Sequence, residues 1–253
     1  MRKTKIICTI GPKTESPKML EKLARAGMNI ARLNMSHGSH ESHDKVIESI
    51  KILNKKLDHP IGILLDTQGP EIRTGDIAND LHLKTDDIIS IVVRGSDNVE
   101  ESSIQINYED LMDDTNIGDT ITVDNGLINL QVLEKQDRLM KVKVIDGGLL
   151  KSKRHVNLPG IRVNLPAITE KDKRDIDFGV KRGVDFIALS FVREAEDINS
   201  LKKILGENQN GIKIVAKLED QEAITNMVEI IKASDGVMVA RGDLGVEIPF
   251  EVL

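Results

Sequence analysis

Strand-length apolar runs alternate with helical patterns at both ends of this 253-residue chain, and this alternation restricts its fold more than any other feature. The six expected strands are Lys5–Ile10, Met28–Leu33, Ile61–Leu65, Val184–Phe191, Ile212–Leu218 and Val237–Ala240. Strands that alternate with helices favour a parallel sheet or barrel covered by those helices. We therefore expect an α/β domain built from residues 1–68 and 166–253, with a different kind of domain inserted between them.

Residue patterns also predict where helices begin and end. Ser16-Pro17 supplies an N-cap and a first-turn proline, and Gly27 supplies a C-terminal stop. Thr169, followed three residues later by Asp172, predicts the capped start of a further helix.

Apolar residues at helical spacing predict the buried faces of three helices. The three sets are Val46, Ile50, Leu53 and Leu57; Ile198, Leu201 and Leu205; and Ile224, Met227 and Ile231. We expect Pro60 to end the first of these helices, because proline lacks the backbone N–H that a helix interior requires.

Residues 69–165 follow another pattern, in which short β-rich runs alternate with polar turns and no convincing amphipathic helix appears. The expected strands are Ile88–Val93, Ile104–Asn107, Thr120–Val123, Leu127–Val132 and Leu139–Ile145. Asn125-Gly126 between two of them signals a two-residue hairpin turn. This pattern predicts an inserted, mostly antiparallel β domain, with Gly69-Pro70 and Leu158-Pro159-Gly160 as stiff hinges.

Composition excludes several classes of protein. A net charge of −6 argues against nonspecific binding to nucleic acid or to anionic membranes. The single cysteine, Cys8, rules out a disulfide within the chain and fits a reducing cytosol. No apolar run approaches the length of a bilayer span, and Met1-Arg2-Lys3-Thr4 lacks an apolar signal region. We expect a cytoplasmic protein without nucleic-acid or membrane partners.

Charged residues follow two consecutive strands of the second β-α stretch. Lys217 and Glu219 come at the end of one strand, and Asp243 follows the next. Parallel neighbours would bring these ends together, and two carboxylates with few other protein ligands suit Mg²⁺. A lysine beside that metal suits stabilisation of an enolate or of a transferring phosphoryl group.

A second group of polar residues follows the strands of the first β-α stretch. Arg32, Asn34 and Ser36 alternate, so they share one face of an extended chain and can hold a phosphate and a monovalent cation. Asp66 and Thr67 can add oxygens to the same cation.

The remaining residues of this kind lie at a hinge and at another strand end. Arg73 lies at the hinge of the inserted domain, where it can clamp a phosphate when that domain closes. The fourth expected strand ends in Ser190-Phe191-Val192-Arg193.

Seven segments, in order along the whole chain, resemble pyruvate kinases. They are KTKIICTIGP (Lys3–Pro12), ARLNMSHG (Ala31–Gly38), LLDTQGPEIRTG (Leu64–Gly75), VNLPG (Val156–Gly160), FIALSFVR (Phe186–Arg193), AKLEDQEA (Ala216–Ala223) and VMVARGDLGVEIP (Val237–Pro249). The resemblance implies a (β/α)₈ TIM-type barrel interrupted after its third strand by a small β-barrel-like lid domain. It also implies transfer of a phosphoryl group from phosphoenolpyruvate to ADP, giving pyruvate and ATP in glycolysis, with Mg²⁺ (or Mn²⁺) and K⁺ as cofactors.

The same resemblance implies a role for each matching residue. For the substrate, Arg32 would bind the phosphate, Lys217 would stabilise the enolate, and the backbone of Gly242 and Asp243 would receive the carboxylate. The implied metal ligands are Glu219 and Asp243 for Mg²⁺, and Asn34, Ser36, Asp66 and Thr67 for K⁺. The implied contacts to the nucleotide phosphates come from Arg73, His37 and Arg154. Arg154-His155 departs from the Lys-Gly that the family usually has before VNLPG, which replaces a point charge with a planar fork.

The resemblance covers six of the eight barrel strands, and the family's last two strands, its substrate-site threonine and its C-terminal domain have no counterpart here. From this we expect residues 1–253 alone to be inactive, and either poorly soluble or self-associating, and the full-length form to be a homo-oligomer. Two alternatives remain: a Mg²⁺-dependent enolate aldolase or lyase on a related barrel, and an inactive truncated relative that only binds ligands. An assay for ATP formation separates them.

Overall fold

The computed structural model describes residues 3–94, 103–206 and 211–248. The chain divides into two compact units. Unit 1 comprises Met1–Pro70, Pro166–Leu218 and Ala223–Val239, and unit 2 comprises Glu71–Leu165, Glu219–Glu222 and Ala240–Leu253. Each unit has its own hydrophobic core, and each is described separately below.

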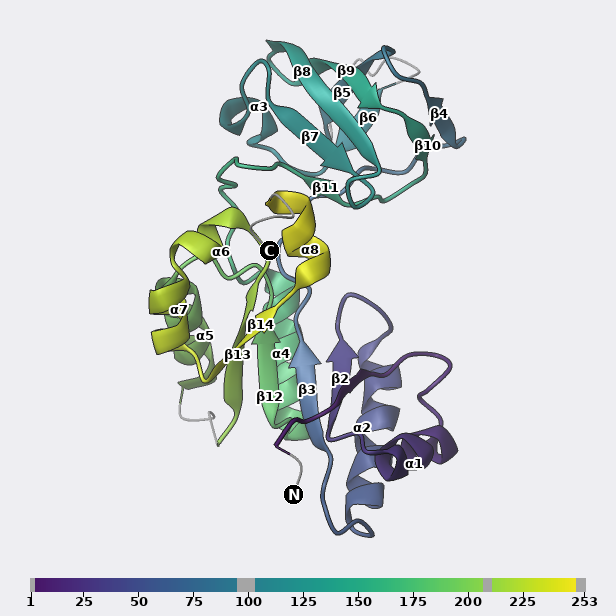
Figure 1. Ribbon diagram of the computed structural model, residues 1–253, viewed down its shortest axis with the longest axis vertical. Coiled ribbons are helices and arrows are strands. Elements are labelled where there is room, and N and C mark those ends of the chain that lie inside the picture. The colour runs from purple at the N-terminus through teal and green to yellow at the C-terminus, as the bar shows by residue number, and fades with distance from the viewer. Residues whose placement is uncertain (1–2, 95–102, 207–210, 249–253) are drawn as a thin grey trace. The chain divides into compact units, whose positions relative to one another are not determined.

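Unit 1 is built on a six-stranded parallel sheet (Figure 1). Its strands are β1 (Ile7–Thr9), β2 (Ile30–Asn34), β3 (Gly62–Asp66), β12 (Phe186–Leu189), β13 (Lys213–Leu218) and β14 (Gly236–Val239). They lie in the order in which they occur along the chain, and every neighbouring pair is parallel. The six parallel strands expected from the sequence are confirmed.

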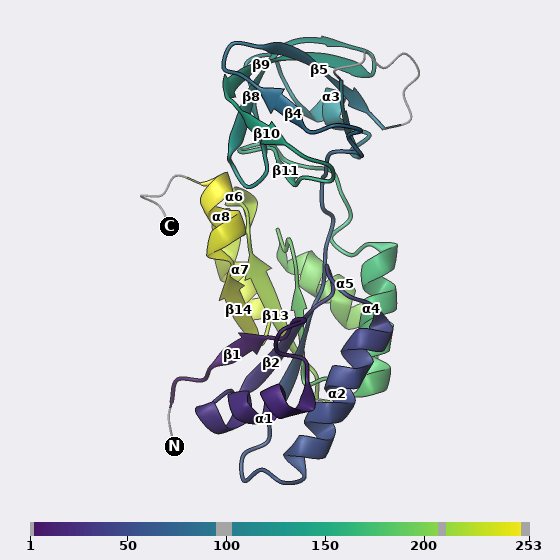
Figure 2. The same ribbon diagram turned by 90° about the vertical axis from the view of Figure 1, so that its right-hand side faces the viewer.

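Seven helices of the described residues connect or follow these strands. They are α1 (Pro17–Ala26), α2 (His40–Asn54), α4 (Glu170–Arg182), α5 (Ala195–Leu205), α6 (Gln221–Thr225), α7 (Met227–Ala233) and α8 (Arg241–Glu247), the last of which belongs to unit 2. Helices α2 and α4 lie side by side against the same face of the sheet (Figure 2). The capping signals are confirmed: Ser16 caps α1, Gly27 ends it with φ 110°, and Thr169 forms a capping box with Asp172.

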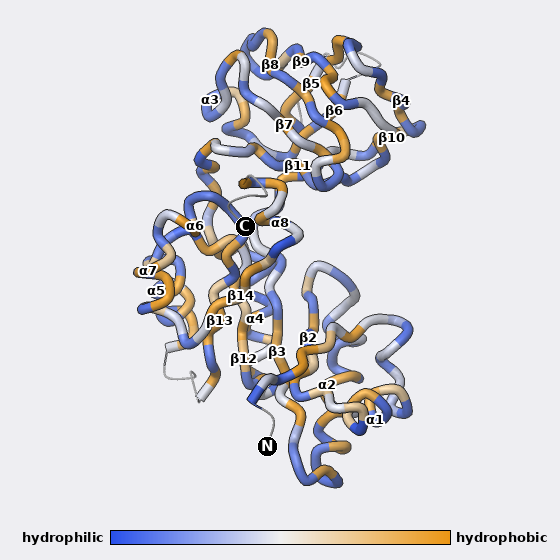
Figure 3. Tube along the Cα trace, viewed as in Figure 1, coloured by the Kyte–Doolittle hydropathy of each residue, from blue (hydrophilic) through white to orange (hydrophobic). Residues whose placement is uncertain are grey.

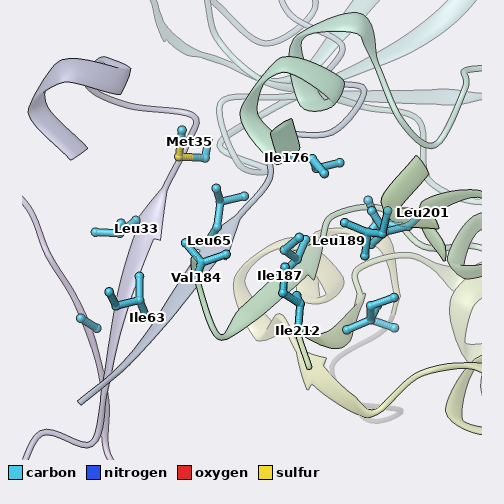
Figure 4. Packing of buried hydrophobic residues seen from close by; sticks show 14 of the residues in the cluster. Leu33, Met35, Ile63, Leu65, Ile176, Val184, Ile187, Leu189, Leu201 and Ile212 are labelled. Atoms are coloured by element: carbon cyan, nitrogen blue, oxygen red, sulfur yellow. The ribbon is translucent and has the colours of Figure 1, made fainter. Parts of the chain in front are cut away.

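The core of unit 1 lies between the sheet and its helices. Strands β3, β12 and β13 are mainly hydrophobic along their length, as expected for strands buried on both faces (Figure 3). Leu33, Leu65 and Leu189 contribute to this core from β2, β3 and β12, and Ile176 and Leu201 contribute from α4 and α5, with Leu201 beside Leu189 (Figure 4). The apolar face predicted for α5, Ile198, Leu201 and Leu205, is buried as expected.

Two helix predictions are wrong in detail. Helix α2 ends at Asn54, well before Pro60, because the Asn54 side chain both accepts a hydrogen bond from Ile61 N–H and donates one to the Ile61 carbonyl. These bonds tie the end of α2 to Ile61, the residue before β3.

The other error concerns the helix expected to bury Ile224, Met227 and Ile231. The segment forms two short helices, α6 and α7, that meet at Asn226. The break shifts the helical phase, so Ala223 and Ile230 are buried while Met227 and Ile231 are exposed.

Unit 2 contains a six-stranded, mostly antiparallel sheet and a two-stranded one. The larger sheet has the order β11 (Val156–Asn157), β7 (Thr120–Val123), β8 (Ile128–Gln136), β9 (Leu139–Asp146), β5 (Ile88–Val93) and β6 (Ile104–Ile106). The smaller pairs β4 (Leu81–Leu83) with β10 (Gly148–Leu150). The predicted β-rich character is confirmed, although the very short strands β4, β10 and β11 and the four-residue helix α3 (Leu111–Asp114) were not predicted.

Two local features shape this unit. The predicted hairpin joins β7 to β8, with φ of 58° at Asn125 and 83° at Gly126, although Asp124 also has a positive φ and pairing stops at Val123–Ile128. The segment Arg73-Thr74 makes single antiparallel bridges to His155 and Ile106. It therefore links the strand at one edge of the sheet, β6, with the residue preceding the other edge strand, β11.

No helix in the described part of the chain is long and apolar enough to cross a membrane.

Candidate active site

The carboxyl ends of β2 and β3 bring Arg32 and Asp66 together in unit 1. Asp66 is fully buried, and one of its oxygens, Oδ2, lies 2.5 Å from both Nε and Nη2 of Arg32. Nη1 of the same guanidinium donates to the Thr9 hydroxyl at 2.8 Å. Hydrogen bonds between ionised partners are stronger than those between neutral ones. The pairing with Asp66 therefore holds the Arg32 guanidinium in one position at the end of the sheet.

Lys217, at the end of β13, reaches the same carboxylate. Its Nζ lies 3.2 Å from Oδ1 of Asp66 and donates to Oγ of Ser190 at 2.7 Å. The Ser190 hydroxyl in turn donates to the Thr67 carbonyl at 2.7 Å, and Ser190 N–H donates to Thr67 Oγ1 at 3.0 Å. One buried carboxylate thus binds two cations from different strands, which compensates a charge that would otherwise be costly to bury.

The expected K⁺ ligands lie at the same end of unit 1. Asn34 and Asp66 are partners in the parallel register of β2 and β3, and Ser36 N–H donates to Asn34 Oδ1 at 3.0 Å. Thr67 follows Asp66 directly. The four residues therefore lie at the same end of the sheet, where Asp66 pairs with Arg32 and Lys217. Their role as K⁺ ligands stays a prediction.

One contributor to this cluster, Thr9, was missed from the sequence, and Ser190 was noted at a strand end but given no role. Thr9 and Ser190 hold the two cationic side chains, although neither has a charge that would mark it as part of a site. Position was the signal for Ser190, which directly follows β12, the strand between β3 and β13.

Both expected Mg²⁺ ligands, Glu219 and Asp243, fall within unit 2. Glu219 is buried and Asp243 is half-buried at the start of α8. Nearby, Nδ2 of Asn157 donates to Glu247 at 2.7 Å. Burial raises the pKa of Glu247, and the negative charges of Asp220 and Asp243 add to the effect, whereas the hydrogen bond from Asn157 opposes it. This segment therefore concentrates acidic groups, as a divalent cation site requires.

Among the described residues, no group of three or more His, Cys, Asp or Glu side chains is arranged to hold a metal ion. A site with two carboxylates, such as the one expected here, has fewer than three such side chains.

The arginines expected at the nucleotide phosphates are neighbours in unit 2. The backbone of Arg73 forms an isolated antiparallel β-bridge with His155, and the backbone N–H of Arg154 donates to the Thr74 hydroxyl at 2.8 Å. Nε of Arg73 lies 2.7 Å from Glu71, and Nη1 of Arg154 lies 3.5 Å from Asp124. Each arginine is therefore oriented by an acidic partner.

His155 and His37 differ in their surroundings. Burial lowers the pKa of His155 and the Arg73 charge lowers it further, against the opposite effect of Glu71 and Asp243. His37 is exposed in unit 1, and its carbonyl accepts a hydrogen bond from the His43 ring. The neutral state favoured for His155 leaves the positive charge of this region to the arginines.

The fold and this site together define a class: β/α proteins with a polar site at the carboxyl ends of a parallel sheet, where such folds carry their chemistry. Comparison with known proteins agrees and is more specific. The family model described as "Pyruvate kinase, barrel domain" matches residues 1–253. The chain belongs to the pyruvate kinase family.

Curated relatives support this assignment. The pyruvate kinase of Staphylococcus epidermidis (strain RP62A) is 51% identical over 253 residues, and that of Staphylococcus aureus (strain USA300) is 50% identical over 260 residues. Each alignment covers 99% of this chain but 43% of the relative. The chain therefore spans less than half the length of the enzymes that it matches.

Proposed function

We propose that this chain carries part of the active site of a phosphotransferase that transfers the phosphoryl group of phosphoenolpyruvate to ADP, giving pyruvate and ATP. Family membership supports the reaction, and one observation supports the location of the site. Arg32 and Lys217 converge from separate strands on Asp66 at the carboxyl end of the sheet. Two cationic side chains held at one place suit a substrate that carries a phosphate and develops an enolate charge.

The residues of unit 1 then divide the work. Arg32 binds the substrate phosphate in this proposal, while Lys217 stabilises the enolate and the phosphoryl group in transit. Asp66 and Ser190 hold the Lys217 ammonium, so little reorganisation is needed when charge develops. Such positioning, rather than covalent chemistry, accounts for most of the catalysis of phosphoryl transfer.

The proposed metal ions fit the side chains present. Asn34, Ser36, Asp66 and Thr67 would hold K⁺, and Glu219 and Asp243 would hold Mg²⁺ or Mn²⁺. When bound, the divalent ion neutralises charge on phosphate and enolate oxygens. The backbone N–H groups of Gly242 and Asp243 would receive the substrate carboxylate.

Unit 2 contributes the nucleotide contacts in this proposal. Arg73 and Arg154 are adjacent in structure, and with His37 they would bind the phosphates of ADP. Residues 69–165 would form an inserted lid, and the six parallel strands would belong to a (β/α)₈ barrel. A cytoplasmic location and a homo-oligomeric full-length form remain predictions.

The test is a coupled assay for ATP formation, run with the natural full-length protein, phosphoenolpyruvate, ADP, Mg²⁺ and K⁺. We expect ATP to form in proportion to enzyme, and to stop when ADP or K⁺ is withheld. Absence of ATP formation, accompanied by cleavage of a hydroxylated keto acid to pyruvate, would favour the aldolase alternative. If neither ATP formation nor cleavage to pyruvate occurs, the result would favour a ligand-binding relative.

A further inference from the structure

Asp172, near the start of α4, accepts more hydrogen bonds than its own helix requires. The residue is fully buried. Its Oδ2 accepts from the backbone N–H of Thr169 at 2.9 Å and from the Thr169 hydroxyl at 2.5 Å, which completes the capping box. Its Oδ1 faces elsewhere and accepts from the backbone N–H groups of Gln68 at 3.1 Å and Gly69 at 3.0 Å. The second oxygen therefore acts on a segment about a hundred residues away in the chain.

In the part of the chain that the structure describes, the groups that donate hydrogen bonds to Asp172 are all uncharged. The carboxylate is stabilised instead by four neutral donors and by its place at the amino end of a 13-residue helix, where a negative charge is favoured. A buried carboxylate is costly unless it is well hydrogen-bonded, so both oxygens need their donors. Because Asp172 Oδ1 needs the N–H groups of Gln68 and Gly69 as donors, these bonds hold the turn at Gln68-Gly69 in place.

That turn directly follows Asp66 and Thr67, and it packs against the end of β12. Gly69 has φ 74°, and a Cβ there would lie 2.7 Å from the Phe191 ring and 3.0 Å from Ser190 Cβ. Ser190 is in turn bonded to both the hydroxyl and the carbonyl of Thr67. Asp172 is therefore connected to Asp66 and Thr67 through the turn at Gln68-Gly69. Ser190, which packs against this turn, connects it to Lys217.

We propose that Asp172 is a positioning residue, which fixes the turn after β3 so that Asp66, Thr67 and Ser190 keep the spacing needed to bind a monovalent cation and to orient Lys217. The role of the cation rests on the proposed function. The structural part, that Asp172 holds the turn, does not. Asp172 touches no reacting group and acts only through the backbone of Gln68 and Gly69.

The chain contains a matched control in the next β-α unit. Asp197 occupies the same N3 position in α5, and its Oδ2 accepts from the backbone N–H groups of Arg193 and Glu194 at 2.8 and 3.2 Å. These donors are local to α5, whereas those of Asp172 include a distant turn. Helix α2 shows that serine serves at N3 as well, because Ser42 completes the capping box with Ser39. Substitution by serine therefore keeps the cap but cannot reach across to the turn.

The first experiment measures backbone protection in the natural full-length protein, with Asp172→Ser and Asp197→Ser compared by amide hydrogen exchange. We expect exchange at Gln68 and Gly69 to accelerate by about tenfold or more in Asp172→Ser only, as the loss of hydrogen bonds to a charged acceptor implies. Equal protection of this turn in both variants would overturn the proposal, whatever the activity. If Asp172→Ser does not fold, Asp172→Asn takes its place, since it keeps the volume and removes one acceptor oxygen.

The second experiment measures the K⁺ concentration that gives half-maximal ATP formation. We expect it to rise roughly tenfold or more in Asp172→Ser, as for groups that orient metal ligands, and to stay within about twofold in Asp197→Ser. Equal shifts in both variants would show only a general loss of stability and would contradict the positioning role. If the unmodified protein forms no ATP, the proposed function fails, while the exchange measurement still decides whether Asp172 holds the turn.

Discussion

At the scale of single residues, the charge balance around Asp66 carries most of the functional argument. A lone carboxylate without solvent exposure would be strongly unfavourable, yet Arg32 and Lys217 contact its two oxygens separately. The sequence predicted Arg32, Asp66 and Lys217 as members of one site, in which they would bind phosphate, K⁺ and enolate respectively. Their contacts with each other could not be predicted, because strand register and side-chain rotamer decide which neighbours meet.

Lys217→Met is the most direct test of the proposed chemistry. We expect turnover to fall about 100- to 1,000-fold, because a charge aimed at the developing anion is removed. Lys213→Met is the matched control: it lies on the same strand, but its side chain is exposed and pairs with Asp235. Steady-state ATP formation by both variants decides the matter, and near-normal turnover in Lys217→Met would exclude Lys217 from the reaction.

Metal binding can be measured without catalysis. We expect Glu219→Gln and Asp243→Asn each to weaken Mn²⁺ binding by roughly tenfold or more, since each removes a charged oxygen ligand. Glu222→Gln, which lies in the same segment and pairs with Arg162, is the control and should bind Mn²⁺ normally. Titration followed by electron spin resonance provides the measurement. Unchanged affinity in both acidic-site variants would contradict the assignment.

Tyr108 is the only tyrosine, and the chain has no tryptophan, so its ionisation can be followed without interference. Burial raises the pKa of Tyr108, and the hydroxyl's hydrogen bond to Asp114 raises it further, while the Asn164 N–H that donates to the same oxygen opposes the shift. The neutral form is therefore favoured in the folded state. Its contribution to stability is present below pH ~10, the ordinary tyrosine value, and is lost as the pH rises above it.

Absorbance at the tyrosinate band against pH tests this directly. We expect the folded protein to titrate well above the pH of the same protein in denaturant, and Asp114→Asn to narrow the difference. Coincident titration curves would show that Tyr108 is not buried as described.

At the scale of elements, capping signals were reliable because they depend on a few adjacent residues. Helices α1 and α4 begin where Ser16 and Thr169 predicted. The failures, at the end of α2 and in α6 and α7, came from causes without a local signature. Asn54 bonds to a residue seven positions away, and the break at Asn226 changes which side of the helix faces the core.

One close contact between elements gives a sharp test of packing. A Cβ at Gly179 in α4 would lie 2.7 Å from Leu65 Cδ1 in β3. Alanine at an exposed helix position would gain about 1 kcal/mol of helix propensity over glycine, but overpacking a filled core costs about 1–3 kcal/mol. We therefore expect Gly179→Ala to lower the free energy of unfolding by about 1 kcal/mol.

Urea unfolding measures this change, and Leu65→Val supplies the companion variant. In the double variant the two costs should be clearly less than additive, because the shorter side chain relieves the clash. Strict additivity would mean that α4 does not approach β3 this closely.

At the scale of the whole chain, the two hydrophobic cores share no residue in the part that the structure describes. The core of unit 2 is drawn entirely from residues between Ile72 and Leu158, which form one continuous stretch. A continuous segment with its own core can fold alone. We expect residues 71–165 expressed separately to fold, with the ionisation of Tyr108 as suppressed as in the full chain. An ordinary tyrosine titration in this fragment would show that unit 2 depends on the remainder of the chain.

The order of the strands in unit 1 has a consequence for synthesis on the ribosome. Strand β3 pairs with β12, and Ile63 N–H donates to Asp185, a residue 122 positions later. Strands β1 to β3 can pair as soon as they emerge, but the second edge of β3 must wait until β12 has been made, which is about 122 residues later and follows the whole of residues 71–165. At about 5–20 residues per second, that edge stays open for roughly 6–24 s. During this interval β3 offers its unpaired backbone to any neighbouring chain, so the nascent protein is most exposed to mispairing while unit 2 is being translated.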